Sequence, residues 1–366
     1  MSGKTTARRR HRNSIVDWVG GNLLSSWGNA ALTLLALGIV WLAATHFLDW
    51  AVFSAVFTGD DGSACAKPGA GACWPFVWRK LGLFMYGRYP EPERWRINLT
   101  YVLALAGLVP LMIPRAPGKL WLSIYLLAAF PLVGFVLVHG GILGLSDVAT
   151  ELWGGLFLTL VVASVGIAAS FPIGILLALG RRSELPIVRW VSIGFIEFVR
   201  GVPLVTVLFM ASVMLPLFLP PEVTFDKLLR ALIGVALFSA AYLAEVIRGG
   251  LQAIPRGQFE AADALGLSYT QKMGLIVLPQ ALKLVIPGIV NSFISLFKDT
   301  SLVLIIGLFD LLGIVQQSIS ADPKWFSPQT PATGYFFAGV IFWVFCFGMS
   351  RYSAFLERRL TGGDRR

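Results

Sequence analysis

The stretch Ala30–Phe47, AALTLLALGIVWLAATHF, contains no Asp, Glu, Lys or Arg, and neither does the stretch Leu120–Val138, LWLSIYLLAAFPLVGFVLV. A run of about 18 or more apolar residues is long enough to cross the hydrocarbon core of a bilayer as a helix. The whole chain of 366 residues shares this character, because 56% of its residues are hydrophobic and only 14% are charged. The sequence therefore predicts an all-α integral membrane protein.

Apolar runs of this kind recur along the chain and predict about eight transmembrane helices. One run contains Gly201-Val202-Pro203, where we expect a helix break because proline lacks an amide hydrogen and disfavours helix at the preceding residue. Another is interrupted by Lys298-Asp299-Thr300-Ser301, within a stretch that needs only one net crossing. The predicted spans cover residues 28–48, 97–114, 119–138, 150–179, 187–219, 229–252, 273–320 and 334–356.

Lysine and arginine residues gather at the ends of these spans and predict the orientation of the chain. Cytoplasmic loops of membrane proteins carry an excess of both residues. With the N-terminus inside, the inside segments hold about twice as many as the outside segments, and the short outside loop 139–149 holds none. Both termini are therefore predicted to be cytoplasmic. The net charge of +10 then reflects helix ends beside membrane lipids rather than a nucleic-acid partner.

The spans fall into two blocks, joined near the glycine-containing loop 139–149. We expect a cytoplasmic tail at 1–27, a three-helix extension at 28–148 that includes a long outside loop at 49–96, a five-helix block at 149–358, and a second cytoplasmic tail at 359–366. The long loop contains Cys65 and Cys73, which are a candidate disulfide pair if the loop faces an oxidising compartment. The absence of a CxxC pair and of a histidine cluster argues against a metal site.

The inside segment between the sixth and seventh predicted spans has an unusual composition for a loop. We expect a short helix within residues 256–268, in which Gly257 lies near the start and Glu260 lies in the first turn, where a carboxylate suits the positive end of a helix. Ala261 and Ala262 would give this helix a small face that can dock into a groove on another protein. Gly266 can end it in a left-handed conformation. The alternative is an ordinary interhelical loop.

At these residues the sequence resembles a known family. Glu260-Ala261-Ala262, followed by Gly266, Ile276 and Leu278-Pro279, matches the signature of ABC importer permeases. The resemblance implies that residues 149–358 form the five-helix permease core. It also implies that 256–268 is a coupling helix that inserts into a cytosolic ATPase.

Three further motifs are similar to those of importers of polar amino acids. They are Glu197 to Leu204 (EFVRGVPL), Tyr242 to Gly250 (YLAEVIRGG) and Lys298 to Leu302 (KDTSL). The three preceding spans and the long loop depart from the shorter members of that group. The extended layout resembles the M-type permease of general L-amino acid transporters, in which a second, homologous permease completes the pore.

Ionisable residues within spans are costly and usually face a cavity, so they are candidates for the substrate path. Lys298, Asp299, Thr300 and Ser301 could meet the charged groups of an amino acid, or Lys298 and Asp299 could pair with each other. Opposite this segment, at mid-depth, we expect Glu245 and the face from Ser239 to Tyr242. Glu245 and Arg248 lie three residues apart and could instead form a structural ion pair. Arg200 could meet either the ligand or the carboxylate of Glu197.

The chain contains no GxxxxGK[ST] loop, so ATP would be hydrolysed by a partner and this chain would bind no cofactor and would not be an enzyme. We predict a permease subunit of an ATP-driven importer of L-amino acids, in the bacterial inner membrane. Its expected partners are a second permease, two copies of a cytosolic ATP-binding subunit and a periplasmic amino-acid-binding protein. The alternatives are a secondary amino-acid transporter driven by an ion gradient, with Glu245 or Asp299 as the ion site, and a membrane-embedded enzyme.

Overall fold

A computed structural model describes residues 15–113, 116–218, 220 and 225–362. Helices dominate these residues, and the described parts of the chain contain no β-strand beyond isolated bridges. The first fourteen residues of the predicted N-terminal tail and the last four residues of the predicted C-terminal tail lie outside the described residues. The helices are α1 (Ile15–Asn22), α2 (Trp27–Leu48), α3 (Trp74–Tyr86), α4 (Arg94–Met112), α5 (Lys119–Ile124), α6 (Phe130–His139), α7 (Gly155–Arg181), α8 (Pro186–Gly201), α9 (Leu204–Phe209), α10 (Lys227–Ala253), α11 (Arg256–Ala264), α12 (Tyr269–Gln271), α13 (Leu278–Leu284), α14 (Ile286–Asp299), α15 (Leu311–Ala321) and α16 (Thr330–Gly362).

By length and composition, seven helical segments of the described chain can cross a membrane, or up to eight if a sharply bent pair counts as one span. The prediction of about eight transmembrane helices is therefore confirmed. Of the interrupted run predicted at 273–320, only Ile286–Ile306 qualifies as a span. The segments that qualify are Trp27–Phe53, Glu91–Met112, Lys119–His139, Gly155–Arg181, Lys227–Ala253, Ile286–Ile306 and Gln329–Arg359, with Pro186–Gly201 plus Leu204–Phe218 as the bent pair.

The chain divides into two compact units. The first unit comprises Met1–Phe76 and Lys324–Thr333, and the second comprises Val77–Pro323 and Gly334–Arg366. The first predicted span and most of the cysteine-containing loop fall in the first unit. The second and third predicted spans share the second unit with the predicted permease core.

The first unit contains a helix without a packed face and a tightly packed loop. No residue of α2 is buried. In the loop, Cys65 and Cys73 form a disulfide, with their Cα atoms 5.6 Å apart. The amide of Cys73 donates a hydrogen bond to Thr333 Oγ1 at 2.8 Å, and Trp74 Nε1 donates to the carbonyl of Ala51 at 2.9 Å.

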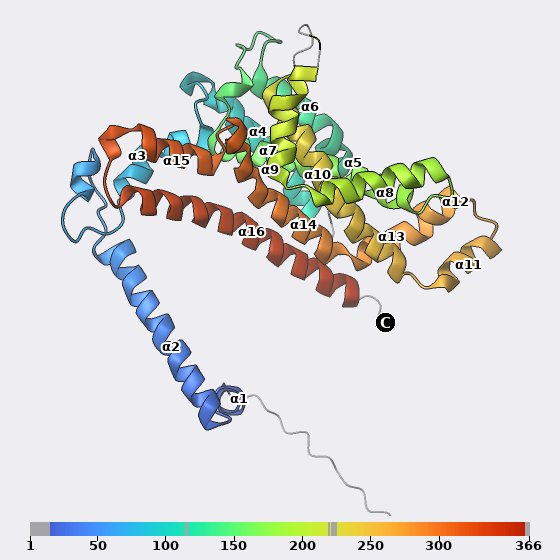
Figure 1. Cartoon of the computed structure of the whole chain (residues 1–366), viewed down its shortest axis with the longest axis horizontal. Helices are drawn as coiled ribbons and strands as arrows, with labels where there is room; N and C mark the ends of the chain where they lie inside the picture. Colours follow the sequence, from blue (N-terminus) through green and yellow to red (C-terminus); the bar gives the residue numbers. More distant parts are fainter. Residues whose placement is uncertain (1–14, 114–115, 219, 221–224, 363–366) are drawn as a thin grey trace, which may run out of the picture. The chain divides into compact units, whose positions relative to one another are not determined.

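The second unit is built around the contact between α7 and α10 (Figure 1). A methyl group at Gly174 of α7 would lie only 2.9 Å from the Cβ of Leu243 and 3.2 Å from the carbonyl oxygen of Ala240. Small residues allow helices to approach closely in membranes, where packing rather than water drives their association. The glycine therefore permits the close approach on which the rest of this unit is arranged.

Helices α4 and α6 share the core of α7 within the same unit. Tyr89 and Tyr101 make edge contacts with the ring of Phe157 on α7, at centroid distances of 6.4 and 6.3 Å. The start of α4 is held by Arg96, which is 2% exposed and pairs with Glu93 at 2.7 Å. Arg96 also donates to the carbonyl of Ser146 at 2.8 Å. The contacts of Arg96 bind the loop before α7 to the start of α4.

Candidate functional site

A sharp bend separates α8 from α9 and determines where the charged residues of α8 lie. Helix α8 ends at Gly201 and α9 begins at Leu204, and the helix direction bends by 106° between them. The break predicted at Gly201-Val202-Pro203 is therefore confirmed. The extended backbone of Pro203 ends one helix and starts the next. Helix α8 thus runs across the end of α7, where a methyl group at Gly180 would lie 2.3 Å from Ser192 Oγ.

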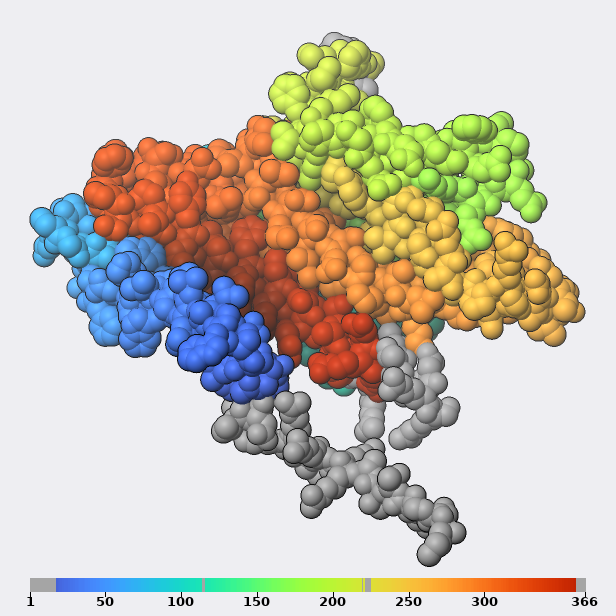
Figure 2. Space-filling model, turned by 60° about the horizontal axis from the view of Figure 1, so that its bottom comes forward, coloured from blue at the N-terminus to red at the C-terminus, as the bar shows by residue number. Residues whose placement is uncertain are grey.

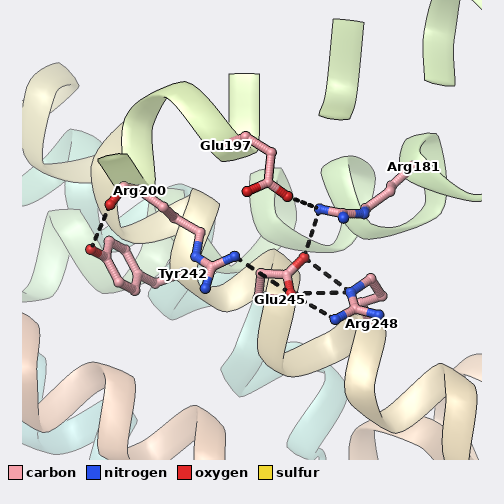
Figure 3. A network of polar contacts seen from close by, with 6 residues as sticks. All are labelled: Arg181, Glu197, Arg200, Tyr242, Glu245 and Arg248. Atoms are coloured by element: carbon pink, nitrogen blue, oxygen red, sulfur yellow. Dashed lines mark hydrogen bonds and ion pairs between the residues drawn. The ribbon is translucent and has the colours of Figure 1, made fainter. Parts of the chain in front are cut away.

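A network of ion pairs joins three helices at this bend (Figure 3). Its centre is Glu245 of α10, whose side chain is 16% exposed. The carboxylate of Glu245 accepts a hydrogen bond from Arg181 Nη1 at 2.8 Å, and bonds from Nε and Nη2 of Arg248 at 3.0 and 2.9 Å. Arg181, the last residue of α7, also binds Glu197 of α8 at 2.8 Å. The predicted pair between Glu245 and Arg248 is therefore present.

Arg200 completes the network from α8. Its Nη1 lies 3.5 Å from Glu245 Oε2, and its guanidinium carbon lies 5.8 Å from the centre of the Tyr242 ring. A cation over an aromatic face is attracted by the ring quadrupole. Three arginines thus face two glutamates, so the network carries one surplus positive charge. The sequence left open whether Arg200 meets Glu197 or a ligand, and the structure brings it to Glu245 and Tyr242.

The Lys298–Ser301 segment has a different local structure. Helix α14 ends at Asp299, and a 3₁₀ segment, η9 (Thr300–Ile306), continues the span. Thr300 is buried and donates to the carbonyl of Phe297, while Ser301 donates to the carbonyl of Lys298. Lys298 is exposed and Asp299 is half-buried. Within the described chain, no ion pair joins these two side chains, so the predicted alternative of an internal Lys298–Asp299 pair is not formed.

The Glu245 network and the Lys298–Ser301 segment lie at different levels along the contact between α10 and α14. A methyl group at Gly288 would lie 2.8 Å from the side chain of Val246, next to Glu245. Near the other end of this contact, Val235 and Leu296 both lie against Gly166 of α7. The ten residues from Val235 to Glu245 span about 15 Å of helix. Glu245 therefore does not face Lys298, which differs from the predicted arrangement.

The predicted coupling segment forms α11, and two details differ from the expectation. Pro255 precedes the helix, which begins at Arg256, so Glu260 lies in the second turn rather than the first. Ala262 is fully buried, so it cannot belong to an exposed docking face, whereas Ala261 is exposed. Gly266 has φ of +73°, which is the predicted left-handed end. Figure 2 shows α11 and α12 in yellow-orange at one end of the second unit.

An open cavity of about 380 Å³ lies beside α11, between the ends of α7 and α10. Arg182 crosses its edge, because Nη1 donates to the carbonyl of Leu251 at 3.1 Å and the guanidinium carbon lies 5.6 Å from the centre of the Phe259 ring. Phe259 belongs to α11, so Arg182 connects the end of α7 to the coupling segment. The cavity is lined by Arg182, Leu251, Gln252, Ile254, Arg256, Phe259 and Glu260.

Sequence reasoning did not select Arg181, Arg182, Glu197 or Phe259 as functional residues. The two arginines were assigned only to the orientation rule, which already explains basic residues at an inside helix end. Their partners come from α8, α10 and α11, and only the packing of these helices brings them together. One usable signal was the doublet itself, since adjacent residues on a helix point about 100° apart and can serve different neighbours.

A buried carboxyl group lies outside both the Glu245 network and the Lys298–Ser301 segment. Asp310 caps α15 by accepting a hydrogen bond from the amide of Gly313 at 2.9 Å, and it is fully buried. Burial raises the pKa of Asp310 to about 6, although backbone amides of Gly313 and Leu312 oppose the shift. Its Oδ2 atom has no hydrogen-bond partner within the described part of the chain.

The described chain combines a bent span, an ion-pair network at the bend and a short helix, α11, after α10. Residues 170–362 match the family model described as "Binding-protein-dependent transport system inner membrane component". The chain is 53% identical to the inner membrane amino-acid ABC transporter permease protein YhdY of Escherichia coli (strain K12), over 94% of this chain and 93% of that protein.

Two further relatives differ in how much of this chain they cover. The glutamate/glutamine/aspartate/asparagine transport system permease protein BztC of Rhodobacter capsulatus is 40% identical, over 96% of this chain and 94% of its own length. The probable glutamine ABC transporter permease protein GlnP of Bacillus subtilis (strain 168) is 36% identical, over 94% of its own length but only 57% of this chain. The extended layout is therefore shared with the first two relatives.

The chain belongs to the family of binding-protein-dependent transport system inner membrane components, and it is a permease subunit of an ABC transporter. Such a subunit is not itself an enzyme. ATP is used by a partner ATPase, and a substrate-binding protein is the other partner that this family implies.

Proposed function

We propose that this chain imports polar L-amino acids as one of two homologous permeases, at the expense of ATP hydrolysed by two copies of a cytosolic subunit. The observation that carries the proposal is the match over nearly the whole chain to permeases named for amino-acid transport. The motifs at Glu197–Leu204, Tyr242–Gly250 and Lys298–Leu302 agree with it. A periplasmic amino-acid-binding protein would deliver the substrate.

The proposed substrate path passes two polar levels. At the first, Lys298 and Asp299 form no ion pair with each other within the described residues, and an amino acid supplies a carboxylate and an ammonium group of matching sign. Irregular backbone at membrane depth is tolerated where it lines a cavity, as the change to 3₁₀ geometry at Thr300 and Ser301 would do. Discontinuous helices form the ligand sites of other transporters, and here the span changes from α to 3₁₀ geometry without a break.

The second level lies at the bend of α8. Arg200 and Tyr242 present a cation and an exposed aromatic ring, and the network around Glu245 has one surplus positive charge. Ser239 lies on α10 one turn from Tyr242 but is buried, so it would position the helix rather than meet the substrate. A substrate carboxylate leaving the first level would meet Arg200 at the second.

For the coupling role, we propose that Gly257, Glu260 and Ala261 contact the partner ATPase, while Ala262 anchors α11 to the rest of the unit and Gly266 ends the helix. This division follows their exposure, since Ala262 alone of this set is buried. The proposal places α11 and both termini in the cytoplasm, and the disulfide loop 49–96 in the periplasm of a bacterial inner membrane.

Thiol labelling tests this orientation. Cys65 and Cys73 should resist a membrane-impermeant maleimide in intact spheroplasts, and should react with it from outside after reduction. Cys346 lies in the span Gln329–Arg359 and serves as an internal reference that is independent of reduction. Labelling of Cys65 and Cys73 only after the inner face is opened would reverse the orientation.

Reconstitution tests the transport function. The chain is assembled with its partner permease, ATPase and binding protein in proteoliposomes, and uptake of a mixture of radiolabelled L-amino acids is measured. Uptake should require ATP and should persist when proton and sodium gradients are collapsed. Uptake that continues without ATP and follows an imposed ion gradient would contradict the proposal and favour a secondary transporter.

A further inference from the structure

Two consecutive arginines at the end of α7 bind different parts of the second unit. Arg181 binds the carboxylates of Glu197 and Glu245, which belong to α8 and α10. Arg182 donates to the carbonyl of Leu251 and lies over the ring of Phe259. Since adjacent residues leave a helix about 100° apart, one helix end can hold two separate neighbours.

We propose that this arginine pair is the link through which movement of the coupling segment reaches the bend of α8. The proposal rests on the proposed function, because it assumes that α11 moves with a partner ATPase. The contact between Arg182 and Phe259 is the end of the link at α11. Arg181 and Glu197 form the end that holds α8. Both arginines are positioning residues, since neither is assigned to the substrate path.

The contacts are suited to transmission because each arginine is restrained at more than one point. Arg182 makes a hydrogen bond and a ring contact, and Arg181 makes two ion pairs of 2.8 Å. Because the guanidinium group is planar, few of its orientations keep both contacts of each arginine. A displacement of Phe259 therefore displaces Arg182 and, through the shared backbone, Arg181.

The surroundings of α11 strengthen this assignment. An open cavity of about 380 Å³ lies beside it, so part of the space between α11 and the end of α10 contains no packed side chains. After Ala253, α10 continues into α11 only through Ile254 and Pro255. Arg182 bridges this short connection, because it contacts Leu251 before it and Phe259 after it.

The first test compares Arg182→Ala with Arg189→Ala in the complete reconstituted transporter. Arg189 is an exposed arginine on α8, at the same end of the unit, and provides the matched control. The measurement is the number of ATP molecules hydrolysed for each labelled amino acid imported. Loss of the link should raise this ratio about tenfold for Arg182→Ala, within the range of known coupling between sites. Arg189→Ala should keep the wild-type ratio.

A purely structural role would give a different result. It would lower the yield and thermal stability of the assembled complex and leave the ratio of ATP to transport unchanged in the complex that forms. Arg182→Lys is the conservative variant, because it keeps a cation near Phe259 but loses the fork, and it should restore only part of the coupling. Full coupling in Arg182→Ala, in a transporter whose wild type shows ATP-driven uptake, would overturn the link while leaving the proposed function intact.

A double-mutant cycle tests whether the two ends act through one another. Phe259→Leu removes the aromatic face and keeps an apolar side chain, and Glu197→Gln removes the charge that Arg181 holds on α8. Residues in one chain of contacts show non-additive effects, whereas independent residues add. The variant with both changes should therefore be no worse coupled than the more severe single variant. Strictly additive losses would contradict the link.

Discussion

The charges around Glu245 and the charges at Lys298–Asp299 both lie in membrane spans, but in the part of the chain that the structure describes only those around Glu245 are paired with one another. Glu245 is bound by Arg181 and Arg248 at 2.8 to 3.0 Å and lies 3.5 Å from Arg200. Lys298 and Asp299 follow one another at the end of α14 without forming an ion pair, within the described chain. The first group holds three helices together, and the second leaves its charges available.

This difference teaches how to separate structural charge from ligand-binding charge in a membrane protein. A charge in low dielectric surroundings needs a partner, because desolvation disfavours the ionised form. Where the partner is in the chain, substitution should damage assembly. Where the partner is the substrate, substitution should damage transport and leave assembly intact.

Glu245→Gln should give the largest effect. The change keeps a similar shape but removes a carboxylate from Arg181 and Arg248, of which only Arg181 retains another, on Glu197. Removing one partner of a buried ion pair costs several kcal/mol, and we expect about 3 kcal/mol here because Glu245 retains 16% exposure. The yield of assembled complex in detergent and its thermal stability should both fall. A complex that assembles normally and loses only transport would place Glu245 with the ligand-binding charges.

Asp299→Asn should give a smaller and different effect. The amide removes one charge without changing shape, and a lost charge-assisted hydrogen bond to the substrate should weaken apparent affinity by about 2 kcal/mol. Complex yield should match the wild type, as should stimulation of the ATPase by the empty binding protein. Poor assembly of this variant would contradict the comparison, since Asp299 would then have a structural partner. Unchanged uptake and affinity would move the ligand site to the partner permease.

The coupling segment sharpens the comparison, because its proposed role depends on backbone geometry rather than charge. Gly266 has φ of +73°, and no heavy atom lies within 4 Å of the position of an added Cβ. An L-residue in this conformation is strained by about 1 kcal/mol. Gly266→Ala should therefore lower ATP-coupled uptake modestly, while Gly266→Asn should retain it because asparagine tolerates the left-handed region.

Gly249→Ala provides the matched control for this backbone effect. Gly249 lies within α10 without a positive φ, and an added Cβ there also meets nothing within 4 Å. The alanine should leave uptake unchanged. Equal losses in the variants at Gly249 and Gly266 would show that loss of glycine, rather than the left-handed geometry, is responsible.

Local sequence patterns predicted the spans and the helix breaks well. Gly201-Val202-Pro203 identified the bend because proline acts on its immediate neighbours. The end of the coupling helix at Gly266 was also predicted from a local property, because glycine readily adopts the left-handed conformation that ends a helix. The partners of Arg181 and the burial of Ala262 were not predicted, because both depend on how α8, α10 and α11 pack. The position of Glu245 relative to Lys298 was wrong since sequence order does not give the register between two packed helices.

Asp310 supplies the smallest test, because no cation in the described part of the chain pairs with it and no ligand is proposed for it. Burial raises its pKa to about 6 in the folded chain, above the ordinary value of 3.8. A carboxyl group whose pKa is raised binds its proton more tightly when folded, so stability increases as pH falls from about 6 towards 4 and is lost again as pH rises. Asp310→Asn keeps an acceptor for the amide of Gly313 but cannot titrate, and its own buried amide group offsets part of the gain. The rise from 3.8 to about 6 corresponds to about 3 kcal/mol at pH 7.5, and the cost of burying the asparagine amide brings the expected difference in stability between the two proteins below about 1 kcal/mol. The thermal unfolding temperature of the wild type should rise as the pH is lowered from 7.5 to 5, and the variant should lack the part of this rise that Asp310 causes. An identical pH dependence in both proteins would mean that Asp310 has a partner which neutralises it, as Glu245 has.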